Sequence, residues 1–175
     1  LLGELPSKMV KTLLEVRGLE TSFRSHHGLV RAVNGVSFAL QPQETLGIVG
    51  ESGCGKSVLA RSIMRLIPTP PGQIEAGTIQ FKGQDLLKHS ERQMQRIRGN
   101  QISMIFQEPM TALNPVIRVG RQLGEIFNKH RGLNRVQALE ASVEMLRLVG
   151  IPSPGRRAAE YPFQMSGGMR QRVVI

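Results

Sequence analysis

Apolar and polar residues alternate in two neighbouring stretches near the start of the chain, residues 13–23 and 36–40. A period of two predicts strands that bury one face and expose the other. A His26-His27-Gly28 turn separates the two stretches, and Pro42 ends the second one. Two such strands joined by a turn indicate an antiparallel sheet.

Short continuous apolar runs predict a different kind of strand from the alternating stretches. The segments Leu46–Val49 and Ile102–Phe106 are almost continuously apolar, which is typical of strands buried on both faces of a sheet. Residues 77–81 predict one more short strand, and Lys82-Gly83 predicts the turn that follows it.

Four segments carry the spacing of three and four residues that marks a helix face. They are residues 59–67, 90–98, 116–127 and 134–149. Pro68 ends the first of them, and Gly150 and Pro152 end the last. Ser90 with Gln93, and Asn134 with Gln137, have the spacing of residues that cap helix N-termini. The order is therefore mixed strands, one strand–loop–helix unit and a helical stretch.

The loop between the Leu46–Val49 run and the first helix carries the clearest chemistry. Its sequence fits the phosphate-loop pattern G-x-x-x-x-G-K-[ST] and reads Gly50-Glu51-Ser52-Gly53-Cys54-Gly55-Lys56-Ser57. Glycines let the backbone curl around a phosphate, and the helix N-terminus adds its positive dipole end. Lys56 can reach β- and γ-phosphate oxygens, and the Ser57 hydroxyl can ligate Mg²⁺. The loop predicts binding of a nucleoside triphosphate. The alternative interpretation is an ordinary glycine-rich turn between a strand and a helix.

Cys54 lies inside this loop and has two interpretations. A helix N-terminus lowers the pKa of a thiol, which allows a reactive redox role. Alternatively, cysteine is present because a small side chain suits the loop.

Composition excludes several classes of protein. The chain has 175 residues, 40% of them hydrophobic and 21% charged, which suffices for about one domain with a core. No run approaches the roughly 20 apolar residues of a membrane span, and the first eleven residues lack the apolar segment of a secretory signal. A single cysteine excludes a disulfide framework. We expect an intracellular globular protein in which residues 1–8 are a leader or an expression remnant.

The formal net charge of +10 first suggests nucleic acid or an anionic membrane as a partner. However, no block of five like charges occurs, and Tyr161 is the only Trp or Tyr available for stacking on bases. A nucleic-acid-dependent P-loop ATPase therefore remains only as an alternative. Asp85 is the only aspartate in the chain.

Two further segments narrow the class of P-loop protein. Gln107 directly follows the Ile102–Phe106 run, and Ser166-Gly167-Gly168-Met169-Arg170-Gln171 precedes a helix-like run. With the phosphate loop, they resemble the ATP-binding cassette (ABC) family of transporter ATPases. Residues 50–57, 104–115 and 161–173 look like the oligopeptide, dipeptide and nickel importers of that family, and the resemblance runs from about Leu13 to Ile175. Met165 stands where leucine is usual and Phe163 where histidine is usual, and we expect both to be apolar or packing positions.

The resemblance implies an α/β fold, with a P-loop NTPase (RecA-like) core, an antiparallel β subdomain and an α-helical subdomain, incomplete at the C-terminus. Residues 9–90 would form the β subdomain and P-loop core. Residues 91–165 would hold the Gln107 loop and the helical subdomain, which docks on the membrane protein. Residues 166–175 would be the signature motif and the start of its helix.

The resemblance also assigns roles to residues. Gly50 to Ser57 would bind ATP, and Phe23 would stack on adenine, although packing in the first strand is an equally good interpretation of Phe23. Ser57 and Gln107 would lie at the Mg²⁺ ion, with Gln107 near the attacking water; a buried structural glutamine is the alternative. The signature residues would face the ATP held by a second ATPase subunit, and they are Ser166, Gly167, Gly168, Met169 and Gln171.

The partners that the resemblance implies are a second ABC ATPase subunit in a homo- or heterodimer, transmembrane permease subunits and, through them, an extracytoplasmic solute-binding protein, with no nucleic acid. The protein would lie peripherally on the cytoplasmic face of the cell membrane. There it would power import of peptides, or of nickel and related small solutes, by binding and hydrolysing ATP.

Three catalytic groups of the family are absent from the sequence: a later Mg²⁺-binding aspartate, the glutamate after it and a histidine near the γ-phosphate. Asp85 comes too early in the chain to substitute for the aspartate. Because positioning and electrostatics supply nearly all phosphoryl-transfer catalysis, we expect these 175 residues alone to be inactive and to belong to a longer ATPase. A nucleotide-binding module that does not hydrolyse ATP is the alternative function.

Overall fold

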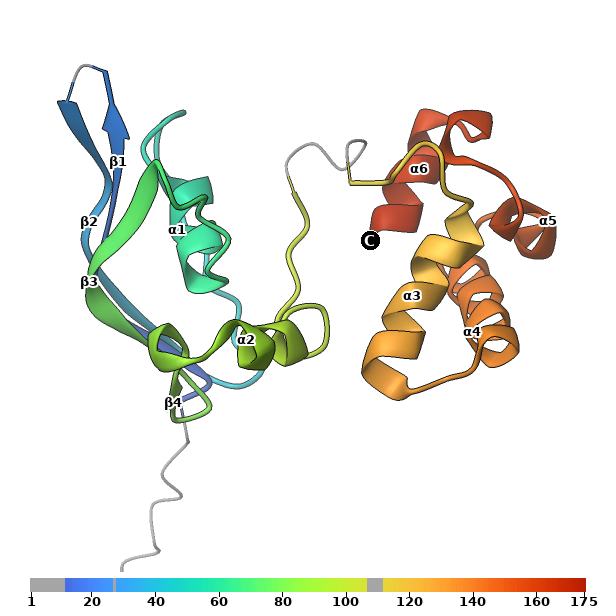
Figure 1. Cartoon of the computed structure of the whole chain (residues 1–175), viewed down its shortest axis with the longest axis horizontal. Helices are drawn as coiled ribbons and strands as arrows, with labels where there is room; N and C mark the ends of the chain where they lie inside the picture. Colours follow the sequence, from blue (N-terminus) through green and yellow to red (C-terminus); the bar gives the residue numbers. More distant parts are fainter. Residues whose placement is uncertain (1–11, 27, 107–111) are drawn as a thin grey trace, which may run out of the picture. The chain divides into compact units, whose positions relative to one another are not determined.

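The computed structural model describes residues 12–26, 28–106 and 112–175. The chain divides into two compact units, with the boundary between Gln95 and Arg96. The first unit is built on a sheet and the second on helices, as Figure 1 shows. No helix in the described ranges is both long and apolar enough to cross a membrane.

The first unit contains a four-stranded antiparallel sheet in the order β2-β1-β3-β4 (Figure 1). Its strands are β1 (Leu14–Ser25), β2 (Gly28–Leu40), β3 (Gly72–Phe81) and β4 (Gln84–Asp85). The predicted hairpin is confirmed, because β1 pairs with β2 from Leu14 opposite Leu40 to Ser25 opposite Gly28, although β2 begins eight residues before the predicted position. β3 begins five residues before the predicted position, and β4 was not predicted.

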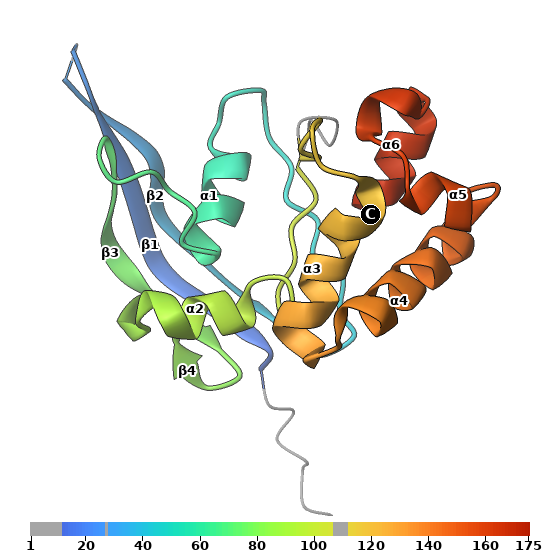
Figure 2. The same ribbon diagram turned by 45° about the vertical axis from the view of Figure 1, so that its right-hand side comes forward.

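Helix α1 (Lys56–Ile63) lies on one face of this sheet, as Figures 1 and 2 show. It buries Leu59, Ser62 and Ile63, and the sheet contributes the fully buried Leu19 and Ile79. The prediction that α1 extends to residue 67 is wrong. The helix ends at Ile63 because Arg65 takes a left-handed backbone conformation, with φ of 52°.

Helix α2 (Glu91–Ile97) follows a capping box that the sequence predicted. The Ser90 backbone N–H donates to Gln93 Oε1 over 2.7 Å, and the Gln93 N–H donates to Ser90 Oγ over 3.4 Å. The short basic helix expected after Ser90 is therefore confirmed.

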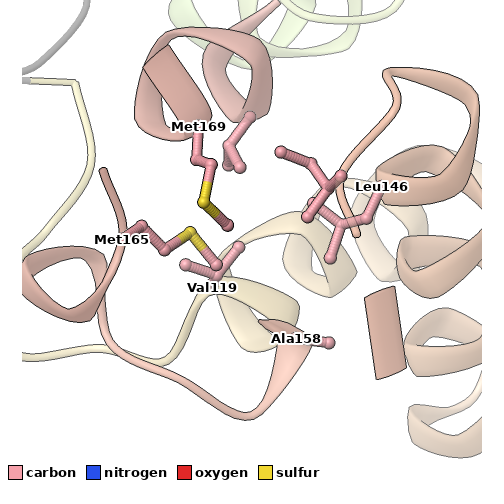
Figure 3. Packing of buried hydrophobic residues seen from close by; sticks show 7 residues of the cluster. Val119, Leu146, Ala158, Met165 and Met169 are labelled. Atoms are coloured by element: carbon pink, nitrogen blue, oxygen red, sulfur yellow. The ribbon is translucent and has the colours of Figure 1, made fainter. Parts of the chain in front are cut away.

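The second unit is helical, and Figure 3 shows its core. Its helices are α3 (Val119–Arg131), α4 (Arg135–Leu148), α5 (Pro154–Ala158) and α6 (Gly167–Val174). Met165 and Met169 converge with Val119 in a buried cluster (Figure 3). The other members of this cluster are Leu146, Ile151, Ala158 and Val173.

The start of α4 was predicted correctly, whereas the start of α3 was not. Asn134 Oδ1 accepts from the N–H groups of Val136 and Gln137 at 3.0 Å each, and Gln137 Oε1 accepts from the Asn134 N–H. Val116, by contrast, lies outside α3 and is 76% exposed. Helix α5, which is only five residues long, was not predicted.

The prediction of buried strands at 46–49 and 102–106 is wrong for the described residues. Neither segment forms a strand, although an isolated bridge joins Arg98 to Ile102. Val49 is 92% exposed and Ile105 is 59% exposed. A strand requires hydrogen bonds to a neighbouring strand, and a doubly buried one also requires cover on both faces. The described part of the chain supplies neither to these two segments.

Candidate phosphate-binding loop and signature helix

Gly55 fixes the phosphate loop against the sheet. It precedes α1 with φ of 96°, a conformation that costs any residue with a Cβ about 1–2 kcal/mol. A Cβ at Gly55 would also lie 2.0 Å from the backbone oxygen of Ala32 on β2. Only glycine allows this close approach, so the loop sits directly against the β2 backbone.

The opposite end of the loop is similarly tight. A Cβ on Gly50 would lie 2.7 Å from the Cys54 sulfur, and the Cys54 N–H donates to the Glu51 carbonyl over 3.3 Å. The Cys54 thiol is exposed and lies 3.5 Å from the Lys56 ammonium nitrogen. This crowding fits the requirement for a small side chain at position 54, and both interpretations of Cys54 stay open.

Lys56 holds the loop closed around its own ammonium group. Its Nζ donates to the Gly50 carbonyl over 2.7 Å and to the Glu51 carbonyl over 2.6 Å. The Ser57 side chain is exposed in the first turn of α1, where no acidic residue lies. A lysine, a hydroxyl and a helix N-terminus therefore meet at one place, which is an arrangement suited to a phosphate anion. Glu51 is exposed.

Phe23 lies on β1, and its ring packs on the start of β3. The ring atom Cε1 is 2.7 Å from the position that a Cβ on Gly72 would take, and the side chain is half-buried. Val30 pairs with Phe23 across the β1–β2 ladder and is 54% exposed. Phe23 thus packs against the sheet and still offers an open apolar surface, so neither of its two interpretations is eliminated.

The signature segment begins helix α6 in the second unit. Ser166 caps the helix by accepting a hydrogen bond from the Met169 N–H over 3.3 Å, and Gly167 and Gly168 are exposed. The Met169 side chain is only 9% exposed, because it packs in the core cluster. Only the backbone of Met169 therefore lies at the exposed N-terminus of α6, and its side chain lies in the core.

Arg172 ties α6 to the end of α4. Its guanidinium donates to the Gly150 carbonyl over 2.7 Å and to the Val149 carbonyl over 3.4 Å. Gln171, the last predicted signature residue, is exposed on the same helix. The N-terminus of α6 is thus a polar, accessible end on a helix that is anchored by its apolar side and by Arg172.

Two expectations about this region have different outcomes. Met165 is a packing position, since it is 4% exposed in the cluster. Phe163 is not, because it is 69% exposed and stacks on Tyr161 with ring centroids 5.6 Å apart. Of the two expected apolar or packing positions, Met165 therefore packs in the core, whereas Phe163 is apolar but exposed. Gln107 lies outside the described residues.

Asp85 has a local structural role at the end of β4. Its carboxylate accepts from the Leu87 N–H over 3.1 Å and lies 3.6 Å from the Lys88 ammonium. Within the described ranges, no three His, Cys, Asp or Glu side chains gather in a way that could hold a metal. Ser57 is the described residue that could offer an oxygen to a Mg²⁺ ion at the phosphate loop, and Gln107, the other predicted residue at that ion, lies outside the described residues.

A groove in the second unit was missed at the sequence level. It lies between α3 and α4, is also lined by α5 and Tyr161, and has a volume of about 1170 Å³. Its small buried residues are Gly120, Gly124, Ala138 and Ala158. The sequence indicates this groove only through Gly120 and Gly124, two small residues four positions apart on α3. Their spacing does not predict a groove unless α5 is known to form.

A glycine loop that wraps a lysine and opens a helix on an antiparallel sheet, in a chain that also has a separate helical unit, defines a P-loop nucleotide-binding protein. Comparison with known families makes this specific. The sequence profile of the family described as ABC transporter matches residues 33–175. The chain therefore belongs to the ABC transporter family, and the recognition from sequence is confirmed.

Curated relatives share about half of their residues with this chain over its matched length. The chain is 52% identical over 166 residues to the "Oligopeptide transport ATP-binding protein OppD" of Bacillus subtilis, covering 95% of this chain and 46% of that protein. It is 55% identical over 163 residues to the "Probable peptide ABC transporter ATP-binding protein y4tR" of Sinorhizobium fredii, covering 93% and 49%. The chain thus spans about half the length of the curated relatives it matches.

Solved structures support the fold. The structure described as "Dimeric Structure of MJ0796, a Bacterial ABC Transporter Cassette" superposes with a TM-score of 0.78 at 22% identity, covering 93% of this chain and 67% of that chain. A second structure of that cassette, described as bound to ADP and Pi, gives the same TM-score at 21% identity. The predicted α/β fold with a P-loop core, an antiparallel sheet and helices is confirmed.

Proposed function

We propose that the protein is the ATP-binding subunit of a membrane importer for peptides, and that it hydrolyses ATP to drive import. The observation that carries the proposal is the closed phosphate loop, in which Lys56 lies within 2.7 Å of two loop carbonyls at the start of α1. The names of the relatives, oligopeptide transport and peptide transport proteins, favour peptides over nickel as the solute.

In this proposal, ATP contacts two parts of the first unit. Its phosphates take the N–H groups of the loop and the Lys56 ammonium, and Ser57 provides one oxygen to Mg²⁺, which would neutralise phosphate charge. The adenine ring lies on the apolar surface that Phe23 and Val30 leave open. Val30 is two residues, or about 7 Å, along β2 from Ala32, which touches the loop. That separation is within the length of a nucleotide.

The signature helix supplies the contact to a second ATPase subunit. An exposed helix N-terminus capped by Ser166 and flanked by Gly167 and Gly168 favours an anion in front of it. We assign that anion as the γ-phosphate held by the loop of the paired subunit. Hydrolysis then requires two subunits, and Gln107 acts near the attacking water.

The groove between α3 and α4 fits the permease as a partner. Gly120 and Gly124 pack closely against α4 and α5 of the same unit, and the exposed Leu139 and Val116 offer apolar contact to a ligand. Charged residues of both signs line the same groove, among them Arg121 and Glu140. A short amphipathic helix of a membrane subunit is the kind of ligand that such a groove takes. The protein then lies on the cytoplasmic face of the membrane.

The test is substitution of Lys56 in the full-length protein. Lys56→Ala removes a charged contact to phosphate worth about 1.5–3 kcal/mol, so ATP affinity falls at least tenfold and ATP-driven peptide uptake by the assembled transporter stops. Lys88→Ala, in the same unit with its side chain 83% exposed, is the matched control and retains both activities. Equal ATP affinity in Lys56→Ala and wild type would refute the proposed site. If ATP-driven transport requires Lys56 but no peptide is taken up, the proposal that the solute is a peptide is wrong.

A further inference from the structure

A buried pair of hydroxyl groups joins the sheet to the helix that follows the phosphate loop. Thr21 Oγ1 on β1 and Ser62 Oγ on α1 are 2.9 Å apart, and both residues are 0% exposed. Buried hydroxyls must be hydrogen-bonded to be tolerated, so this contact constrains the geometry of both elements.

The direction of the hydrogen bond follows from the neighbouring contacts. Ser62 Oγ also lies 2.8 Å from the Val58 carbonyl, to which a hydroxyl can only donate. A serine hydroxyl has one proton, so Ser62 donates it to Val58 and accepts from Thr21. Thr21 is thus the donor across the interface between β1 and α1.

The strand is irregular at this residue. The register of β1 against β2 shifts on both sides of Thr21, and the register against β3 shifts between Glu20 and Thr21. As a result, two consecutive residues, Thr21 and Ser22, are buried instead of alternating. Register irregularities of this kind aim individual side chains and occur often beside functional sites. Here the irregularity turns the Thr21 hydroxyl toward α1.

The same two elements carry the two ends of the nucleotide site proposed above. Helix α1 begins at Lys56, about 9 Å along the helix from Ser62, and β1 places Phe23 two residues after Thr21. The remaining contacts of α1 include Leu59 and Ile63, which are apolar and therefore non-directional. A directional hydrogen bond fixes the position of α1 along β1 in a way that apolar packing does not.

We propose that the Thr21–Ser62 hydrogen bond is a positioning contact that sets the spacing between the phosphate loop and the base-binding strand. This inference rests on the proposed ATP site. If the inference is correct, loss of the hydrogen bond lowers the affinity for ligands that contact both the phosphate loop and β1. It does not change the affinity for ligands that contact only the loop. ATP is the first kind of ligand, and inorganic tripolyphosphate is the second.

The experiment measures the affinity of the full-length protein for ATP and for tripolyphosphate by calorimetric titration. Thr21→Val keeps the shape of the side chain and removes the donor. We expect it to weaken ATP binding about two- to tenfold, the equivalent of one hydrogen bond, and to leave tripolyphosphate binding unchanged. Thr21→Ser restores the hydroxyl and restores ATP affinity.

The matched control is Ser142→Ala in the second unit. Ser142 is also 0% exposed and also donates to the carbonyl four residues earlier, Ala138, over 2.7 Å. It has the local bond of Ser62 without a bond to a strand, so we expect its removal to change neither affinity. If Ser142→Ala weakens ATP as much as Thr21→Val does, the effect is general destabilisation and the inference is wrong.

Other outcomes are equally decisive. A parallel loss of ATP and tripolyphosphate affinity in Thr21→Val, or no loss of either, overturns the positioning role. If Thr21→Val does not fold, Thr21→Val/Ser62→Ala, which leaves no unpaired hydroxyl across the interface, is measured with the same expectation. Lys56→Ala separates the two proposals, because it lowers both affinities if the loop binds phosphate. If it lowers neither, the ATP site itself is wrong, and the inference falls with it.

Discussion

The close contact between Gly55 and β2 allows the stability loss of a Gly55→Ala variant to be predicted. In Gly55→Ala, the new Cβ would meet the Ala32 carbonyl oxygen at 2.0 Å, while the backbone keeps a φ of 96°. The left-handed conformation costs about 1–2 kcal/mol. Relief of the clash requires a movement of about 1.5 Å between backbones, and overpacking of this kind costs about 1–3 kcal/mol. We therefore expect a loss of about 2–5 kcal/mol of stability in the first unit.

Gly53→Ala is the matched control for this substitution. Gly53 has a similar φ of 82°, but a Cβ there would meet nothing within 4 Å. Its cost should be the conformational part alone, about 1–2 kcal/mol. The difference between the two variants therefore isolates the contact with Ala32.

The assay is native-state hydrogen exchange of the amides in α1, which reports the opening free energy of this unit separately from the helical unit. The Leu59 N–H, which donates to the Gly55 carbonyl over 2.8 Å, is a suitable probe. Exchange at α4 amides should be the same in wild type and in both variants. Equal losses in Gly55→Ala and Gly53→Ala would show that the loop is not held against β2, and the reasoning from the close approach would fail.

Two predictions concern the helical unit. Asn134→Ala removes the cap of α4 and should cost about 1 kcal/mol by urea unfolding, whereas Ser153→Ala should cost little, because Ser153 makes no capping hydrogen bond. The guanidinium groups of Arg157 and Arg156 lower the pKa of Glu160 below 4.5, against a smaller opposing effect of burial. The stability from Glu160 is therefore present at neutral pH and is lost as pH falls through its lowered pKa. Glu160→Gln should flatten the decline of melting temperature in acid, and a profile that matches wild type would contradict this.

Local signals in the sequence were sufficient for much of this fold. The hairpin of β1 and β2 follows from alternation with a turn at Gly28, because neighbouring strands need no distant partner. The caps at Ser90 and Asn134 were recognised because each capping box is complete within four residues. The phosphate loop was recognised for the same reason, since Gly50 to Ser57 is a contiguous pattern.

Features that depend on distant segments were not predicted correctly. Leu46–Val49 has the composition of a buried strand, but composition cannot specify which segment pairs with it. The exposure of Phe163 was missed because an aromatic residue near a helix resembles a core position. Its stacking on Tyr161, two residues earlier, provides an alternative contact on the surface. In both cases an apolar side chain was taken as evidence of burial, although burial depends on what surrounds it.

The phosphate-loop motif and the three-dimensional structure give different information about the candidate site. The motif identifies Gly55 and Lys56 as parts of a phosphate loop, but it says nothing about Ala32, whose carbonyl determines where that loop sits on the sheet. The motif likewise ends at Ser57, five residues before the hydroxyl that bonds to Thr21. A nucleotide has a fixed length. A site that binds both of its ends therefore depends on the distance between the phosphate loop and strand β1 as much as on the loop or the strand alone. In the proposed site that distance is set by Thr21 and Ser62, which do not react, and a sequence pattern built from the reacting groups does not contain them.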